Sequence, residues 1–213
     1  MNLVEKATLV AIMAHDAIGQ KRKFTDQPYW QHSCAVADRI SLHSDDEALI
    51  AAGWLHDVVE DTHLDIWHIR SHFGNEVAQY VSDVTKQKPY GEHGDLNTLS
   101  EINRLMTVCS KSKLLKLCDI RCNIEDMSPE CGIGFITEWL TKKFAMVLAI
   151  KQTSPEHVEL CDEIITFART TVRVNFPMAC VTRMFGNGVN MLGKAMELKQ
   201  KEEDADVDAA FNV

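Results

Sequence analysis

The chain contains, at residues 51–62, the segment Ala51-Ala52-Gly53-Trp54-Leu55-His56-Asp57-Val58-Val59-Glu60-Asp61-Thr62. Its first half is typical of a buried helix, because apolar residues fill nearly every position. His56 and Asp57 stand in the middle of this apolar run. A carboxylate that is buried alone is costly or becomes neutral, so Asp57 needs a partner. A metal ion is one such partner.

Glu60 and Asp61 extend the polar stripe of the same segment. On a continuous helix Glu60 follows His56 by one turn, and Asp61 follows Asp57 by one turn. The alternative is a solvated acidic helix end that contains a core histidine. This segment by itself leaves both interpretations open.

The composition is that of an ordinary globular protein. The 213 residues suffice for one compact domain, and 46% of them are hydrophobic and 25% charged. The net charge of -9 and the pI near 5.4 argue against a general nucleic-acid or acidic-membrane surface. A phosphorylated small molecule remains possible, because a few cations and a metal can dominate the field inside a cleft.

The sequence favours a cytoplasmic location. It has no run of 18 apolar residues, and its first residues lack the layout of a secretory signal. The seven cysteines form an odd, scattered set, so we expect reduced and mostly buried thiols instead of a disulfide framework.

Helical periodicity dominates the chain and predicts an all-α fold, a bundle of about eight to ten helices in a single domain over residues 1–200. We expect residues 201–213 to form a polar, acidic, disordered tail. Residues 87–97 carry proline and glycine and predict an exposed loop that could cover a site. The expected helices lie near residues 3–18, 29–40, 47–62, 64–73, 76–86, 98–109, 112–127, 133–151 and 155–174, with a last one from Pro177 that breaks near residues 186–188.

Three further places in the sequence bear on a site. His32 ends a Pro-Tyr-Trp-Gln-His segment, where a lone histidine is more often a core or capping residue than a ligand. Asp119 lies inside the apolar run 114–123 and again needs a partner. Arg22 and Lys23 supply cations before His32, although such a pair is commonly only a solvated surface run.

Taken in order, His32, His56-Asp57 and Asp119 resemble the H…HD…D pattern of the HD metal-dependent phosphohydrolases. The motifs around them are similar to those of the hydrolase domain of RelA/SpoT homologues. The resemblance covers residues 6–127, and several motifs in the right order make coincidence improbable. The motifs are Ala14-His15-x-x-x-Gly19-Gln20-x-Arg22-Lys23, Pro28-Tyr29-x-x-His32, residues 51–62, Phe73-Gly74, Val84-Thr85-Lys86 and Lys116-Leu117-x-Asp119-x-x-x-Asn123.

The resemblance implies a stand-alone alarmone hydrolase. It would remove pyrophosphate from the ribose 3′ position of guanosine tetra- or pentaphosphate and leave GDP or GTP. The implied metal ligands are His32, His56, Asp57 and Asp119, a mixed nitrogen and oxygen set that suits Mn²⁺.

The resemblance also implies roles around the metal. Glu60 and Asp61 would position or deprotonate the attacking water, and Arg22, Lys23 and Asn123 would bind the nucleotide. We expect Tyr29 and Lys86 to be structural. The other histidines, which include His15, are expected on the surface or in packing.

Other interpretations stay open. An HD phosphohydrolase could act on another nucleotide, such as an adenosine alarmone, NADPH or a deoxynucleoside monophosphate. Cys118, Ile120 and Arg121 depart from the usual residues of the last motif, so the pocket wall can differ. The chain could also be a non-catalytic alarmone-binding module, although the intact ligand set argues against this. A toxic alarmone synthetase is a possible functional partner, and the oligomeric state is not readable.

Overall fold

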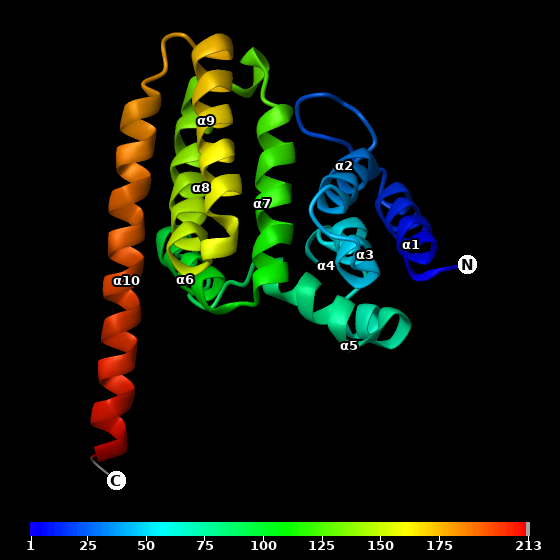
Figure 1. The fold of residues 1–213 in the computed structure, drawn as a ribbon, viewed down its shortest axis with the longest axis horizontal. Helices are drawn as coiled ribbons and strands as arrows, with labels where there is room; N and C mark the ends of the chain where they lie inside the picture. Colours follow the sequence, from blue (N-terminus) through cyan, green and yellow to red (C-terminus); the bar gives the residue numbers. More distant parts are fainter. Residues whose placement is uncertain (212–213) are drawn as a thin grey trace. The chain divides into compact units, whose positions relative to one another are not determined.

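The structure, a computed structural model, describes the backbone of residues 1–211 and the side chains of residues 1–205, and this part of the chain is helical (Figure 1). It contains the α-helices α1 to α10 and two short 3-10 helices, and its only β pairing is an isolated bridge between Lys21 and Pro28. The predicted all-α class is therefore confirmed. The contacts divide the chain into two compact units, whereas the predicted single domain over residues 1–200 stays a prediction.

The first unit comprises residues 1–86 and 108–131. Helix α3 is its centre, because it packs against α1, α2, α5 and α7. Six of the nine residues of α3 are buried, which agrees with the apolar run that begins the segment 51–62. The elements are α1 (Leu3–Ala17), α2 (Trp30–Ser41), α3 (Glu47–Leu55), α4 (Val58–Asp61), α5 (Ile66–Val84), α7 (Ser110–Glu125) and η1 (Pro129–Cys131).

Side chains cap the helices of this unit at several N-termini. Asn2 and Glu5 form a capping box at α1, and the Asp46 carboxylate accepts hydrogen bonds from the first amides of α3. Such caps satisfy backbone donors that have no partner inside the helix. The Asp46 cap fixes the start of α3, and His56 follows the last residue of this helix.

The second unit comprises residues 87–107 and the chain from Gly132 onward. Within it α8 packs against α6, α9 and α10, and the long α10 runs beside α8 in Figure 1. Its elements are α6 (Gly94–Thr107), α8 (Ile133–Thr153), η2 (Pro155–His157), α9 (Val158–Asn175) and α10 (Val181–Phe211).

The first unit agrees with the sequence-based prediction at Gly74 and differs from it in one other place. α5 (Ile66–Val84) covers the two predicted helices 64–73 and 76–86, and non-helical backbone at Gly74, whose φ of 88° only glycine adopts readily, separates them as predicted. The segment 47–62 is not one helix, because α3 ends at Leu55 and α4 starts at Val58. His56 and Asp57 therefore stand at a helix junction.

The second unit differs near its C-terminal end. α10 passes unbroken through residues 186–188, because Gly188 lets it approach α8: a Cβ there would lie 2.8 Å from Phe144 Cβ and 3.0 Å from the Thr141 carbonyl oxygen. Residues 201–213 were expected to be disordered, yet α10 continues to Phe211, in keeping with strong helix formers such as Glu202 and Ala205. Residues 212–213 of that predicted tail lie outside the described residues.

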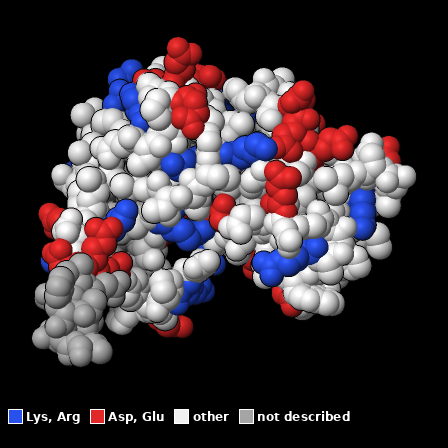
Figure 2. All heavy atoms as spheres, turned by 60° about the horizontal axis from the view of Figure 1, so that its bottom comes forward, with Lys and Arg blue, Asp and Glu red and all other residues white. Residues whose placement is uncertain are grey.

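Two surface properties bear on partners. No helix among the described residues has the length and apolar character that crossing a membrane requires. On the face drawn in Figure 2, lysine and arginine side chains are interspersed with aspartate and glutamate.

Gly53 lies where α3 meets α2, and it supports a stability prediction. A Cβ at Gly53 would lie 2.8 Å from Ile40 Cδ1 and 3.0 Å from the Ala37 backbone, so Gly53→Ala should destabilise the fold by about 1–3 kcal/mol. Gly186→Ala is the matched control. Gly186 is in a helix with nothing within 4 Å of its Cβ position, and this change should stabilise by about 0.5–1 kcal/mol. Urea denaturation measures both, and equal effects would contradict the packing account.

Candidate metal centre and active site

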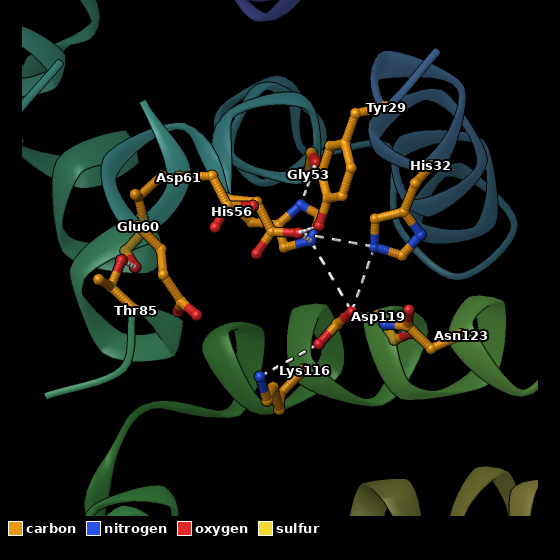
Figure 3. A network of polar contacts seen from close by, with 12 residues as sticks. Tyr29, His32, Gly53, His56, Glu60, Asp61, Thr85, Lys116, Asp119 and Asn123 are labelled. Atoms are coloured by element: carbon orange, nitrogen blue, oxygen red, sulfur yellow. Dashed lines mark hydrogen bonds and ion pairs between the residues drawn. The ribbon is translucent and has the colours of Figure 1, made fainter. Parts of the chain in front are cut away.

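Four side chains from three places in the first unit lie close together. Figure 3 shows three of them, His32, His56 and Asp119, pointing toward one another. His32 comes from α2, His56 and Asp57 from the junction of α3 and α4, and Asp119 from α7. The Nε2 atom of His56 lies 3.0 Å from Asp57 Oδ2, and that of His32 lies 3.3 Å from Asp119 Oδ1. His32, His56 and Asp57 each offer a ligand atom within 4.8 Å of the others. The structure thus brings together the four predicted ligands.

The hydrogen bonds of the two imidazoles leave ring nitrogens that could coordinate a metal ion. His56 Nδ1 lies 2.8 Å from the Gly53 carbonyl oxygen, to which it donates, and this fixes the tautomer that leaves a lone pair on Nε2. Nε2 of His56 and both ring nitrogens of His32 are buried with no hydrogen-bond partner among the described residues. Neighbouring ligand atoms around an octahedral ion with bonds of about 2.1 Å lie about 3 Å apart, which is close to the spacings found here.

The charges in this group also favour a cation. Burial alone would lower the pKa of His56, but the adjacent Asp57 carboxylate outweighs burial and raises that pKa to about 9. Burial would likewise raise the pKa of Asp57, yet His56 and His32 hold it well below its usual range. The carboxylates therefore stay ionised and attract positive charge, which a bound metal ion would supply in place of a proton.

Asp119 is held from both sides on its own helix. The Lys116 ammonium lies 3.1 Å from Asp119 Oδ2, and the Asn123 amide donates to Oδ1 at 2.5 Å. Despite burial, Lys116 and the two imidazoles keep the pKa of Asp119 well below its ordinary value. The sequence-based reasoning gave Lys116 no role. The sequence feature that could have indicated a role is a lysine inside an apolar helix, three residues before a buried carboxylate.

Tyr29 also has a larger role than the structural one that we expected. Its hydroxyl donates to Asp57 Oδ2 at 2.6 Å, while its ring packs against His15 with the ring centres 4.8 Å apart. Burial and the Asp57 charge raise the pKa of Tyr29, so its hydroxyl keeps its proton and can donate. Tyr29 thus orients one predicted ligand.

Glu60 and Asp61, the predicted catalytic pair, have different neighbours. Glu60 is ion-paired with the Lys86 ammonium and also accepts from the Lys86 backbone amide at 3.1 Å. Asp61 accepts a hydrogen bond from the Gln20 amide at 2.9 Å. Burial raises the pKa of Asp61, although Gln20 partly opposes this. Glu60 therefore faces a cation, whereas Asp61 faces a neutral amide.

The predicted nucleotide-binding residues separate into two groups. Arg22 donates to Asn123 Oδ1 at 2.9 Å and to Asp126 Oδ2 at 2.5 Å, so Arg22 and Asn123 lie together. Lys23 is exposed, and its ammonium lies 5.2 Å from the centre of the Phe24 ring. Its role at a nucleotide stays a prediction.

A cavity of about 200 Å³ opens beside this arginine and reaches His32, one of the predicted metal ligands. Arg22 and His32 line it, and Glu125 and Asp126 form an acidic part of its wall. The remaining lining residues are Thr25, Gln27, Gln31, Ala35 and Cys122. The cavity therefore extends from the Arg22 guanidinium to the predicted ligand His32.

A sequence profile of the HD domain matches residues 7–128, which is more than half of the chain. This chain belongs to the HD-domain family. The match covers the elements that carry the four predicted ligands and ends three residues after α7. The resemblance inferred from the H…HD…D motifs is therefore confirmed.

Relatives place the chain more narrowly among HD proteins. It is 32% identical over 122 residues to a guanosine-3′,5′-bis(diphosphate) 3′-pyrophosphohydrolase of Drosophila melanogaster, covering 56% of this chain and 67% of that protein. It is 48% identical over 73 residues to a Synechocystis protein named "Probable guanosine-3′,5′-bis(diphosphate) 3′-pyrophosphohydrolase", covering 34% of this chain. That match spans only 10% of the Synechocystis protein.

A solved structure shares the fold. It is described as a metazoan ortholog of SpoT that hydrolyses ppGpp, and it aligns with 78% of this chain and 95% of its own length. The TM-score is 0.67 and the sequence identity is 23%, so this likeness supports the fold of the HD domain.

The hydrogen bond from Tyr29 to Asp57 gives a prediction for metal affinity. Tyr29→Phe keeps the ring against His15 but removes the donor, so the affinity for a divalent metal should fall about 10- to 100-fold. Tyr80→Phe is the control, because the Tyr80 hydroxyl also donates to a carboxylate, that of Glu76, at 2.7 Å. Isothermal titration of metal-stripped protein measures the affinity. An unchanged affinity in Tyr29→Phe would mean that Asp57 needs no such support.

Proposed function

We propose that this HD domain hydrolyses the 3′-pyrophosphate of guanosine tetra- and pentaphosphate with a bound Mn²⁺, and releases pyrophosphate with GDP or GTP. One observation carries the proposal. Two buried imidazoles place their Nε2 atoms 3.0 and 3.3 Å from two ionised carboxylates, next to the Glu60 and Asp61 pair. The relatives named as 3′-pyrophosphohydrolases supply the substrate class.

His32, His56, Asp57 and Asp119 would hold the metal. A site of two nitrogens and two carboxylate oxygens leaves coordination positions open and suits Mn²⁺ better than a closed thiolate zinc site would. The bound ion would acidify water and neutralise charge on phosphate oxygens. Lys116 and Tyr29 orient the two carboxylates for this purpose.

Asp61 acts as the general base in this proposal. It accepts a proton from water, whose oxygen adds to the phosphorus attached to ribose O3′, and the bond between that phosphorus and O3′ breaks. O3′ takes up the proton that Asp61 received and leaves as the hydroxyl of GDP or GTP. Glu60 positions the water, and its ion pair with Lys86 sets where its carboxylate stands.

The cavity beside Arg22 would receive the nucleoside part of the substrate. A guanidinium can stack on a purine or donate in a fork to phosphate, and Arg22 lies at the cavity wall with His32. Asn123 bridges Arg22 and Asp119, so it links the nucleotide side of the site to the metal side. Lys23 would add a second cation at the phosphates.

We also propose a cytoplasmic enzyme with an alarmone synthetase as its functional partner. The seven cysteines are all free thiols in the structure, as expected for a reducing compartment. A hydrolase of this kind removes the product of a synthetase, so the two activities oppose each other on the same molecule.

Product analysis tests the activity and its dependence on metal. Metal-stripped protein should leave ppGpp intact, and added Mn²⁺ should restore the release of GDP and pyrophosphate in equal amounts. The same assay includes ppApp, NADPH and dGMP. Turnover of one of these in place of ppGpp would overturn the substrate assignment. Turnover of ppGpp without metal would overturn the proposed chemistry.

Arg22→Ala tests the nucleotide side. Losing a charge-assisted contact costs about 1.5–3 kcal/mol, so KM for ppGpp should rise about 10- to 100-fold. Lys21→Ala is the control, because Lys21 is an exposed neighbouring cation that pairs with Asp26 at 3.0 Å. Equal KM values for both variants would remove Arg22 from the site.

A further inference from the structure

A chain of hydrogen bonds links Asp61 to Gln20 and His15, and the proposed hydrolysis does not use it. His15 is completely buried in α1, and its Nδ1 lies 2.6 Å from Gln20 Oε1. The amide nitrogen of the same Gln20 donates to Asp61 Oδ2 at 2.9 Å. The chain joins α1 to the end of α4, across 41 positions of sequence between Gln20 and Asp61.

The end of α1 builds this chain locally. Gly19 has a φ of 61°, and its amide donates to the Asp16 carbonyl oxygen, while the Gln20 amide donates to the His15 carbonyl oxygen. These are the two bonds of a Schellman motif, in which a left-handed glycine reverses the chain after a helix. The reversal returns Gln20 alongside His15. The backbone carbonyl of Gln20 is also fixed, because it accepts from the Tyr29 amide at 3.1 Å.

The positions of the hydrogens follow from Asp61. An ionised carboxylate only accepts, so the Gln20 amide nitrogen must face Asp61 and its oxygen must face His15. His15 then carries its proton on Nδ1 and donates it to that oxygen. Burial lowers the pKa of His15, so the ring is neutral and holds this tautomer. The reverse orientation of the amide would place two oxygens against each other.

His15 is itself held in place by an aromatic neighbour. The Tyr29 ring packs against it at 4.8 Å with an interplanar angle of 40°. The same Tyr29 donates its hydroxyl to Asp57. The buried imidazole therefore supports two acidic groups, Asp57 through the Tyr29 ring and Asp61 through the Gln20 amide.

We propose that Gln20 is a positioning residue for Asp61, and that His15 sets the orientation of the Gln20 amide. Gln20 occupies Oδ2 of Asp61 and so leaves Oδ1 as the oxygen that receives the proton from water. This inference rests on the proposed function of Asp61 as the base. It assigns to the Gln20 side chain a role in the rate of the reaction and none in metal binding.

A double-mutant cycle tests the link to Asp61. Gln20→Ala should lower kcat for ppGpp about 10- to 100-fold, with KM and Mn²⁺ affinity changed by less than about threefold. In an Asp61→Asn background the same change should have no further effect on the residual rate. Gln79→Ala is the matched control, because Gln79 donates to the Asp83 carboxylate at 2.7 Å on the exposed side of α5. Independent, multiplicative losses in the cycle would overturn the proposal.

Substitutions of His15 separate positioning from packing. The side-chain nitrogen of asparagine can take the place of imidazole Nδ1, so His15→Asn should keep kcat within about fivefold. The kcat of His15→Ala should fall by as much as the kcat of Gln20→Ala does. Thermal denaturation reports the fold of each variant. If His15→Asn and His15→Ala are folded and equally slow, His15 does not act through its donor.

A measurement without substrate or metal distinguishes this inference from the proposed function. In the metal-free protein the side-chain amide protons of Gln20 should exchange more slowly with solvent than those of Gln79, as seen by ¹⁵N NMR. That protection should be lost in Asp61→Ala. Unprotected Gln20 amide protons would overturn the positioning role even if ppGpp is hydrolysed. If ppGpp is not hydrolysed and the protection is present, the contact stands and the proposed function fails.

Discussion

Two ionised carboxylates and two imidazoles are buried together in the first unit. The stability of this unit depends on how the free-energy cost of burying these charges is offset. His56 Nε2 and His32 Nε2 lie within 3.0 to 3.8 Å of the Asp57 and Asp119 oxygens. Burying such a group costs free energy when its charges lack partners, because a buried charge loses its hydration. Lys116 balances part of it on α7, and a divalent ion would balance the rest. His56 and Asp57 contribute to this group from the junction between α3 and α4.

Much of the site could be read from residue types in order. From residue types alone, Asp57 and Asp119 were recognised as carboxylates that need a partner, and the resemblance to the HD phosphohydrolases added His32 and His56 and so implied the four ligands that the structure brings together. The all-α class followed from periodicity, because a helix buries one face at a fixed spacing. The predicted alarmone hydrolase remains a proposal that the relatives support.

The parts that escaped prediction depend on local geometry that spacing does not encode. Gln20 could not be assigned to Asp61, since the contact depends on the chain reversal at Gly19 and on a tertiary approach between α1 and α4. Gly188 was interpreted as a helix break, although it is where α10 approaches α8 closely. Residues with little side chain or a neutral amide carry weak sequence signals for such roles.

The most direct test of the metal centre is a crystal structure of Mn²⁺-loaded protein with anomalous data at the manganese edge. The account predicts one anomalous peak, bonded to Nε2 of His32, Nε2 of His56 and the carboxylates of Asp57 and Asp119. A peak elsewhere, or no peak under conditions that support turnover, would contradict the central claim that this buried group is a metal site.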